Sequence, residues 1–237
     1  MFYTLKIKKP PLKWIIIGIS LIVAVIIVIL LFKPAKESVF SPQESREHLL
    51  IDPGHGGIDG GAISLSGIKE SNLNLSIGLK LKSLADLYGV KTVMTRNDDS
   101  MRTDTSSYSE HQELVYRTEL ANKTPGACLI SIHQNFYPTS QPSGAQVLYG
   151  KSEGSRELGI ITHNNIISKL QPDNRRVSMP APKELYITSH INCPGILVEC
   201  GFMSNFGDLQ NLCNEDYQMK LAAVLLASYM QYKNALS

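Results

Sequence analysis

The sequence predicts one α/β domain over residues 48–237, with a β-sheet flanked by helices, preceded by a single transmembrane helix. Short β-branched runs alternate with segments whose apolar residues recur at helical spacing, and Gly, Pro or Asn bounds the runs. Such alternation is typical of a sheet covered on both faces, with functional groups at the strand ends. An uncharged run of 19 residues near the N-terminus predicts the membrane helix.

The first 47 residues divide into three predicted parts. Residues 1–13 carry four lysines and are expected to be a cytoplasmic basic segment. Residues 14–32 would span about 28 Å as a helix at ~1.5 Å per residue, close to the hydrocarbon thickness of a bilayer. Residues 33–47 contain two prolines and many polar residues, which favours a linker.

The positive-inside rule then places the N-terminus in the cytoplasm and everything after residue 33 outside the cell membrane. The expected localisation is a single-pass membrane protein with an extracytoplasmic domain. A cleaved signal peptide is the alternative, but its apolar region would be about 7–15 residues long and would end in a small-x-small site. No convincing cleavage site follows Phe32.

Charge and cysteine content argue against two classes of protein. Residues 1–47 hold seven Lys and Arg against three Glu, so the remaining residues carry a net charge of −2. Because that part has no basic stripe, we expect no nucleic-acid partner. Four scattered cysteines are too sparse for a disulfide framework, although a Cys193–Cys200 bridge stays open.

The elements of the domain are predicted in chain order from these patterns. The strand-like runs lie at 48–52, 90–95, 127–133, 145–149 and 195–200. A first helix carries apolar residues at helical spacing from Leu73 to Tyr88, and a second, which Ser109 would cap, includes Leu114 and Leu120. Two further helices are expected over 153–170 and 215–234.

Four residues are placed to carry chemistry. His55 lies in the glycine-rich stretch DPGHGG after the first strand, and His133 lies near the end of the third strand. Glu70 stands at the start of the first helix, and Glu199 follows the apolar run ILV in a late strand. Strand ends and the adjoining loops are where α/β sheets open their crevices, so these side chains can meet at one rim.

Two imidazoles and one carboxylate form a His₂Glu set that suits zinc with a fourth position free for water. Glu199 could take a proton from such a water and pass it to a leaving amine. Each residue alone also has an ordinary interpretation, as a hydrogen-bonded strand-end histidine or as a first-turn carboxylate. The residues by themselves leave both interpretations open, although a buried carboxylate at Glu199 would be costly without a partner.

The four stretches resemble the zinc-dependent N-acetylmuramoyl-L-alanine amidases of the type-3 family. The family pattern runs DPGHGG, G-x-x-E, SIH-x-N and E-x-GF-x-SN, and it is matched in order at 52–57, 67–70, 131–135 and 199–205. The resemblance covers about 48–237 and implies a twisted mixed sheet between helices. It also implies one Zn²⁺ per chain, held by His55, Glu70 and His133, with Glu199 as the catalytic carboxylate.

By this resemblance the substrate is peptidoglycan, and zinc-activated water cleaves the amide between N-acetylmuramic acid and the L-alanine of the stem peptide. The short, membrane-anchored layout resembles the germination-specific, spore-cortex members, which would place the domain in the forespore intermembrane space. The alternatives are a zinc peptidase acting within stem peptides and a non-catalytic, membrane-tethered wall-binding protein. The sequence does not specify the oligomeric state, the choice between vegetative wall and cortex, or an activator or lipoprotein partner.

Other residues have predicted roles near the four positions. Asn135 either orients its loop or meets substrate, and Asp52 and Asp59 are expected to hold the glycine-rich loop by local hydrogen bonds. Two positions depart from the family pattern: Gln134 replaces a small or apolar residue, and Ser71 replaces the common Lys. Ordinary surface or core positions are expected for His48, His111, His163 and His190, with a place in the cleft as the alternative for His190. The Arg175–Arg176 pair is expected to be solvated, and contact with substrate carboxylates is its alternative.

Overall fold

The computed structural model describes residues 47–101 and 109–236. The basic segment and the transmembrane helix predicted for residues 1–32 lie outside the described residues, as does all but the last residue of the linker. Within the described ranges, no helix combines the length and the apolar character that a membrane crossing requires. The membrane anchor therefore stays a prediction.

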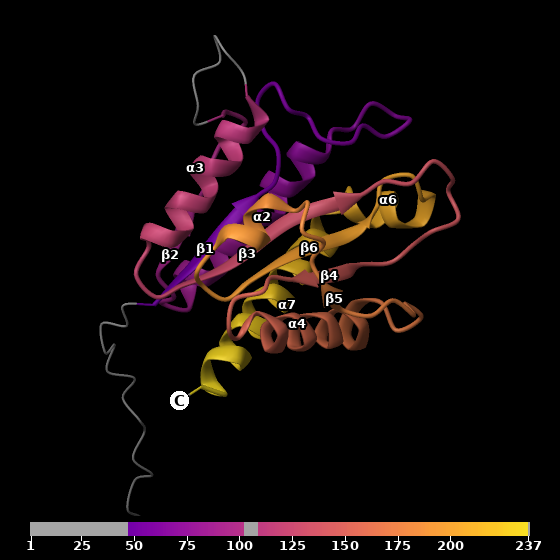
Figure 1. Ribbon diagram of the computed structural model, residues 1–237. Coiled ribbons are helices and arrows are strands. Elements are labelled where there is room, and N and C mark those ends of the chain that lie inside the picture. The colour runs from indigo at the N-terminus through magenta and orange to yellow at the C-terminus, as the bar shows by residue number, and fades with distance from the viewer. Residues whose placement is uncertain (1–46, 102–108, 237) are drawn as a thin grey trace, which may run out of the picture. The chain divides into compact units, whose positions relative to one another are not determined.

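The domain is built on a six-stranded mixed sheet (Figure 1). The strand order is β2-β1-β3-β6-β4-β5, where β1, β2, β3 and β6 are parallel and β4 is antiparallel to β6. All five predicted strands are confirmed, while the exposed two-residue β5 was not predicted because it is too short to show periodicity. The strands are β1 (His48–Pro53), β2 (Thr92–Met94), β3 (Ala127–Asn135), β4 (Gln146–Tyr149), β5 (Met179–Pro180) and β6 (Gly195–Phe202).

Helices cover both faces of the sheet. The four predicted helices are confirmed, and Ser109 caps the second of them by accepting a hydrogen bond from the Gln112 backbone N–H. Two short helices, of five and seven residues, were not predicted, because one or two turns carry too little periodic signal. The helices are α2 (Glu70–Leu87), α3 (Glu110–Lys123), α4 (Ser155–Leu170), α5 (Tyr186–His190), α6 (Phe206–Leu212) and α7 (Glu215–Asn234).

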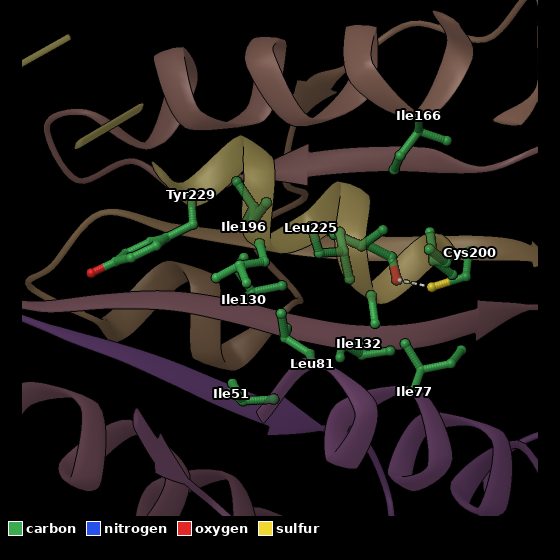
Figure 2. Packing of buried hydrophobic residues seen from close by; sticks show 14 of the residues in the cluster. Ile51, Ile77, Leu81, Ile130, Ile132, Ile166, Ile196, Cys200, Leu225 and Tyr229 are labelled. Atoms are coloured by element: carbon green, nitrogen blue, oxygen red, sulfur yellow. Dashed lines mark hydrogen bonds between the residues drawn. The ribbon is translucent and has the colours of Figure 1, made fainter. Parts of the chain in front are cut away.

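The larger apolar core lies between the sheet and helices α2, α4 and α7 (Figure 2). Strand residues Ile51, Ile130 and Ile196 are fully buried there, together with Ile77 of α2 and Leu225 of α7. Each such side chain contributes about 1.5–3 kcal/mol when it is removed from water. A smaller cluster on the opposite face joins the sheet to α3 and α5, and its buried members are Leu50, Ala121, Leu129, Ile187 and Ile191.

A buried ion pair fixes the end of β1 below the glycine-rich loop. Asp52 is fully buried and accepts hydrogen bonds from Thr95 Oγ1 at 2.7 Å and Ser131 Oγ at 2.6 Å. Its carboxylate also pairs with the Arg117 guanidinium at 2.9 Å. Burial alone would raise the pKa of Asp52, but Arg117 and the two hydroxyls bring it below its usual value. The predicted local role of Asp52 is therefore wrong, because its partners are Thr95, just after β2, Ser131 on β3 and Arg117 on α3.

Arg117 is the residue that links this pair to the loop. Its guanidinium donates to the carbonyl oxygens of Pro53 at 2.9 Å and His55 at 2.8 Å. We expect Arg117→Met to lower the free energy of unfolding by about 3–5 kcal/mol, because Asp52 would stay buried without its countercharge. Urea denaturation measures this loss. The control is Arg175→Met at an exposed site, which should change stability by no more than about 0.5 kcal/mol; equal effects of the two variants would contradict the prediction.

Candidate active site

The loop after β1 bends sharply and presents His55 at the sheet rim. His55 has a φ of 59°, a left-handed conformation that is uncommon for a residue with a side chain. Arg96, which is fully buried, holds the loop by donating to the carbonyl oxygens of Pro53 and Gly54 at 2.9 and 3.0 Å. Gly54 is required here, since a Cβ at this position would lie 2.2 Å from the His133 ring.

The three predicted metal ligands converge at this rim. Glu70 Oε1 lies 3.1 Å from His133 Nδ1 and 3.3 Å from His55 Nε2. One ligand atom from each residue lies within 4.8 Å of the others, so the three form a possible metal site. Gly61 allows the close packing, because a Cβ there would come within 2.6 Å of Glu70 Oε2. The structure thus brings together residues separated by up to 78 positions in the chain.

Hydrogen bonds orient two of these ligands. The His55 Nδ1 atom lies 2.7 Å from Asp59 Oδ2, and Asp59 Oδ1 accepts from the Gly61 N–H at 3.0 Å. This arrangement confirms the predicted local role of Asp59. Glu70 Oε2 accepts from the Ala62 N–H at 3.0 Å. A carboxylate on the far nitrogen of a ligating histidine fixes its tautomer, and here it leaves Nε2 free to bind an ion.

Without an ion, His55 and Glu70 form a charge pair in the site. Burial lowers the pKa of His55, but its hydrogen bonds to Asp59 and Glu70 outweigh burial and raise the pKa to about 10. Burial would raise the pKa of Glu70, yet the hydrogen bonds from His133 and His55 hold it well below its usual range. Without a metal, His55 is therefore protonated and Glu70 is ionised at neutral pH.

Metal binding should consequently release a proton. Because the His55 pKa lies at about 10, an ion binding at Nε2 below that pH must displace the proton, whereas ionised Glu70 has none to give. If His55 is the only group that loses a proton, we expect the apparent affinity for a divalent ion to rise about tenfold per pH unit across neutral pH. Calorimetry in buffers of different ionisation enthalpy counts the protons. Binding with no proton release would contradict this prediction.

Glu199 lies beside the ligand set on the neighbouring strand. In the parallel pairing of β3 and β6, Glu199 stands opposite His133. Its Oε2 atom is buried and has no hydrogen-bond partner among the described residues. Burial raises the pKa of Glu199, and nearby Glu70 raises it further against the opposing charges of His133 and His55. A carboxylate with a raised pKa and a free oxygen is suited to accept and return a proton.

Arg176 also differs from its predicted solvated position. Its side chain is half-buried, with the guanidinium 4.9 Å from the centre of the Phe202 ring and a hydrogen bond of 2.6 Å to Gln146 Oε1. Gln146 stands opposite Glu199 in the pairing of β4 and β6. The positive charge of Arg176 lowers the pKa of Glu199, against the effect of burial. Arg175 is exposed, as predicted.

All four predicted functional residues line one pocket of about 370 Å³: His55, Glu70, His133 and Glu199. Asn135 also lines it, so the predicted contact with substrate is possible, and the backbone oxygen of Asn135 accepts from Met203 N–H at 2.8 Å. The pocket is also lined by residues of α3 and by residues 184–188. None of the other four histidines lines this pocket: His48, His111, His163 and His190.

Sequence reasoning missed two features of the site. The wall at 184–188 had no recognisable motif, since its residues reach the pocket only through the packing of α5 against α3 and β6. Asn74 was also missed, although it is fully buried and donates to Glu70 Oε1 at 3.3 Å. A signal for Asn74 was present, because this amide interrupts the apolar face that Leu73 and Ile77 form.

Comparison with known proteins agrees with this geometry. Residues 49–228 match the family described as N-acetylmuramoyl-L-alanine amidase. The chain belongs to this family. The amidase is thus a peptidoglycan hydrolase, as the sequence pattern implied.

Three proteins match this amidase over nearly the whole of their own length. The germination-specific N-acetylmuramoyl-L-alanine amidase of Bacillus subtilis (strain 168) is 28% identical over 234 residues, which is 94% of this chain and 96% of that protein. The CwlD amidase from Clostridioides difficile, solved in complex with the GerS lipoprotein, has a TM-score of 0.75 and 31% identity over 80% of this chain and 99% of its own. AmiC2 of Nostoc punctiforme has a TM-score of 0.69 and 28% identity, covering 80% of this chain and 98% of that one.

Proposed function

We propose that this amidase uses one zinc ion to hydrolyse the amide between the lactyl group of N-acetylmuramic acid and the L-alanine of the stem peptide. The observation that carries the proposal is the placement of Glu199 opposite His133, beside the His55, Glu70 and His133 set in one pocket. Membership of the amidase family supports the choice of bond.

The donor set fits zinc. Zinc prefers nitrogen and carboxylate ligands, and ligands placed tetrahedrally at about 2.0–2.2 Å from it lie roughly 3.3–3.6 Å apart. The separations of 3.1 and 3.3 Å from Glu70 Oε1 to the two histidine nitrogens are close to that spacing, and all three donor atoms lie within 4.8 Å of one another. A zinc ion held by these three residues would supply an acidic water and polarise the amide carbonyl.

Glu199 carries the proton in this proposal. Its unpartnered Oε2 atom can accept a proton from the attacking water and donate it to the nitrogen of the departing L-alanine. The raised pKa of Glu199 helps the second step, because its carboxyl keeps a proton to a higher pH than an ordinary glutamate does. The walls of the pocket, at α3 and 184–188, would hold the substrate against these groups and exclude bulk water.

We further propose that the amidase acts in spore-cortex maturation or germination, anchored in the membrane by residues 14–32 with its domain outside the cytoplasm. The germination-specific relative from B. subtilis, which this chain matches over 94% of its length, supports that setting. A lipoprotein partner is proposed from the similarity to CwlD, which was solved with GerS. Pull-down of the full chain from sporulating cells, compared with vegetative cells, would test the sporulation setting and the lipoprotein partner.

The deciding experiment is mass spectrometry of peptidoglycan incubated with the full chain, with zinc and with a chelator. We expect zinc-dependent release of intact stem peptides that begin with a free L-alanine amine, and a muramic carboxyl left on the glycan. Cleavage within the stem peptide would identify a zinc peptidase instead. A folded protein that binds no zinc and releases nothing would indicate a non-catalytic wall-binding role.

A further inference from the structure

Two buried side-chain amides lie directly behind the Glu70 carboxylate. Asn74 is one turn further along α2 and is fully buried, and Gln134 follows His133 on β3 and is 3% exposed. Asn74 Nδ2 donates to Glu70 Oε1 at 3.3 Å and to the Gly54 carbonyl oxygen at 3.1 Å. Gln134 Nε2 donates to Asn74 Oδ1 at 3.0 Å. The amides thus form a chain from β3 through α2 to the carboxylate.

This chain fixes which way the Asn74 amide faces. Because Asn74 Oδ1 accepts from Gln134, its Nδ2 is turned toward Glu70 and Gly54. A reversed amide would set an oxygen against the ionised carboxylate and would lose the bond to Gln134. The backbone N–H of Gln134 adds a second donor to Glu70 Oε1, at 3.0 Å. Glu70 Oε1, the oxygen that faces both histidines, thereby accepts hydrogen bonds from the Asn74 amide and the Gln134 backbone.

Gln134 occupies a position where an apolar residue would pack more simply. Ile130 and Ile132, which precede it on the same face of β3, are fully buried in the core beneath α2. Gln134 Oε1 has no hydrogen-bond partner of ordinary geometry among the described residues. The weak donor of the neighbouring Cys200 thiol is directed to the Val198 carbonyl oxygen. Burying an amide oxygen in this way costs free energy. A role beyond packing accounts for a glutamine at this position.

We propose that Asn74 and Gln134 are positioning residues that aim Glu70 Oε1 at His55 and His133, and so set the affinity of the metal site. The inference rests on the proposed zinc-dependent function. Both amides would act through Glu70, which Asn74 contacts directly and Gln134 reaches through Asn74. Partners of this kind, one layer behind a ligand, typically change metal affinity by 10–100-fold when they are removed.

The test measures zinc affinity by chelator competition in the full chain. Gln134→Met and Asn74→Leu keep similar side-chain length while removing the amides, and each should weaken zinc binding about 10–100-fold. The visible spectrum of the Co²⁺-loaded protein should also change, because the carboxylate is no longer held in one orientation. Gln134→Met alone is sufficient if Asn74→Leu does not fold.

Two controls separate positioning from general loosening of the core. Gln218 is an equally buried glutamine, bonded to Ser76 and Lys80 between α7 and α2, so Gln218→Met should lower stability and leave zinc affinity unchanged. Asn72→Leu changes an exposed asparagine on α2 and should alter neither property.

Unchanged zinc affinity and an unchanged Co²⁺ spectrum in Gln134→Met would overturn the inference, as would equal weakening in Gln218→Met. Failure of the parent chain to bind zinc would instead refute the proposed function.

Discussion

Glu199→Gln is expected to lower kcat by about 10²–10⁴-fold while the protein keeps its fold and its metal. The amide has nearly the shape of the carboxylate but cannot take up the proton that Oε2 is placed to accept. Glu199 is not among the three residues that form the possible metal site, so the ligand set stays intact. Removing a buried carboxylate that has one unpartnered oxygen should also leave the stability equal to or higher than that of the parent.

The pH profile gives this prediction a second readout. Burial raises the pKa of Glu199, and the carboxyl must be ionised to accept a proton, so kcat/KM should rise as the pH rises through that raised pKa. Glu199→Gln should keep only a small residual activity, and the pH profile of that activity should lack the rise that depends on Glu199. The matched control is Glu157→Gln, an exposed position on α4, where kcat should not change. Turnover near that of the parent in Glu199→Gln would refute the proton-transfer role.

The candidate site was predictable because its residues occupy strand ends and a helix start. Parallel strands bring their carboxyl ends to one edge, so His55 after β1 and His133 on β3 meet there. The pattern could place Glu199 on a strand but could not show that β6 pairs with β3. That pairing depends on long-range packing, and it sets Glu199 opposite His133.

The features that were missed depend on contacts distant in the sequence. Asp52 was expected to bond locally, but its partners Thr95 and Arg117 lie 43 and 65 residues away, and only the folded sheet brings them near. Arg176 reaches the vicinity of Glu199 because β4 runs back along β6. Short elements such as α5 leave no periodic signal, although α5 contributes to a wall of the pocket.

His133→Ala is expected to abolish tight metal binding. Loss of a residue that only hydrogen-bonds a metal ligand weakens metal binding by about 10–100-fold. Because His133→Ala removes one of the three ligands themselves, zinc affinity should fall by more than roughly 100-fold. The His133 ring packs against Gly54, where even a Cβ would not fit, and no other described histidine or acid is placed to replace Nδ1 in the ligand set.

Thermal unfolding with and without zinc reads out this loss without measuring activity. An ion that binds only the folded state stabilises it by about 2.7 kcal/mol at a free concentration of 100 times Kd, so the Tm of the parent should rise with zinc. The Tm of His133→Ala should stay constant over the same range, whereas that of His190→Ala, at an exposed histidine outside the pocket, should rise like the parent. If zinc raised the Tm of His133→Ala as much as that of the parent, the ion would have to bind elsewhere. Glu199 would then have no activated water beside it, and the assignment of this pocket as the catalytic centre would fail.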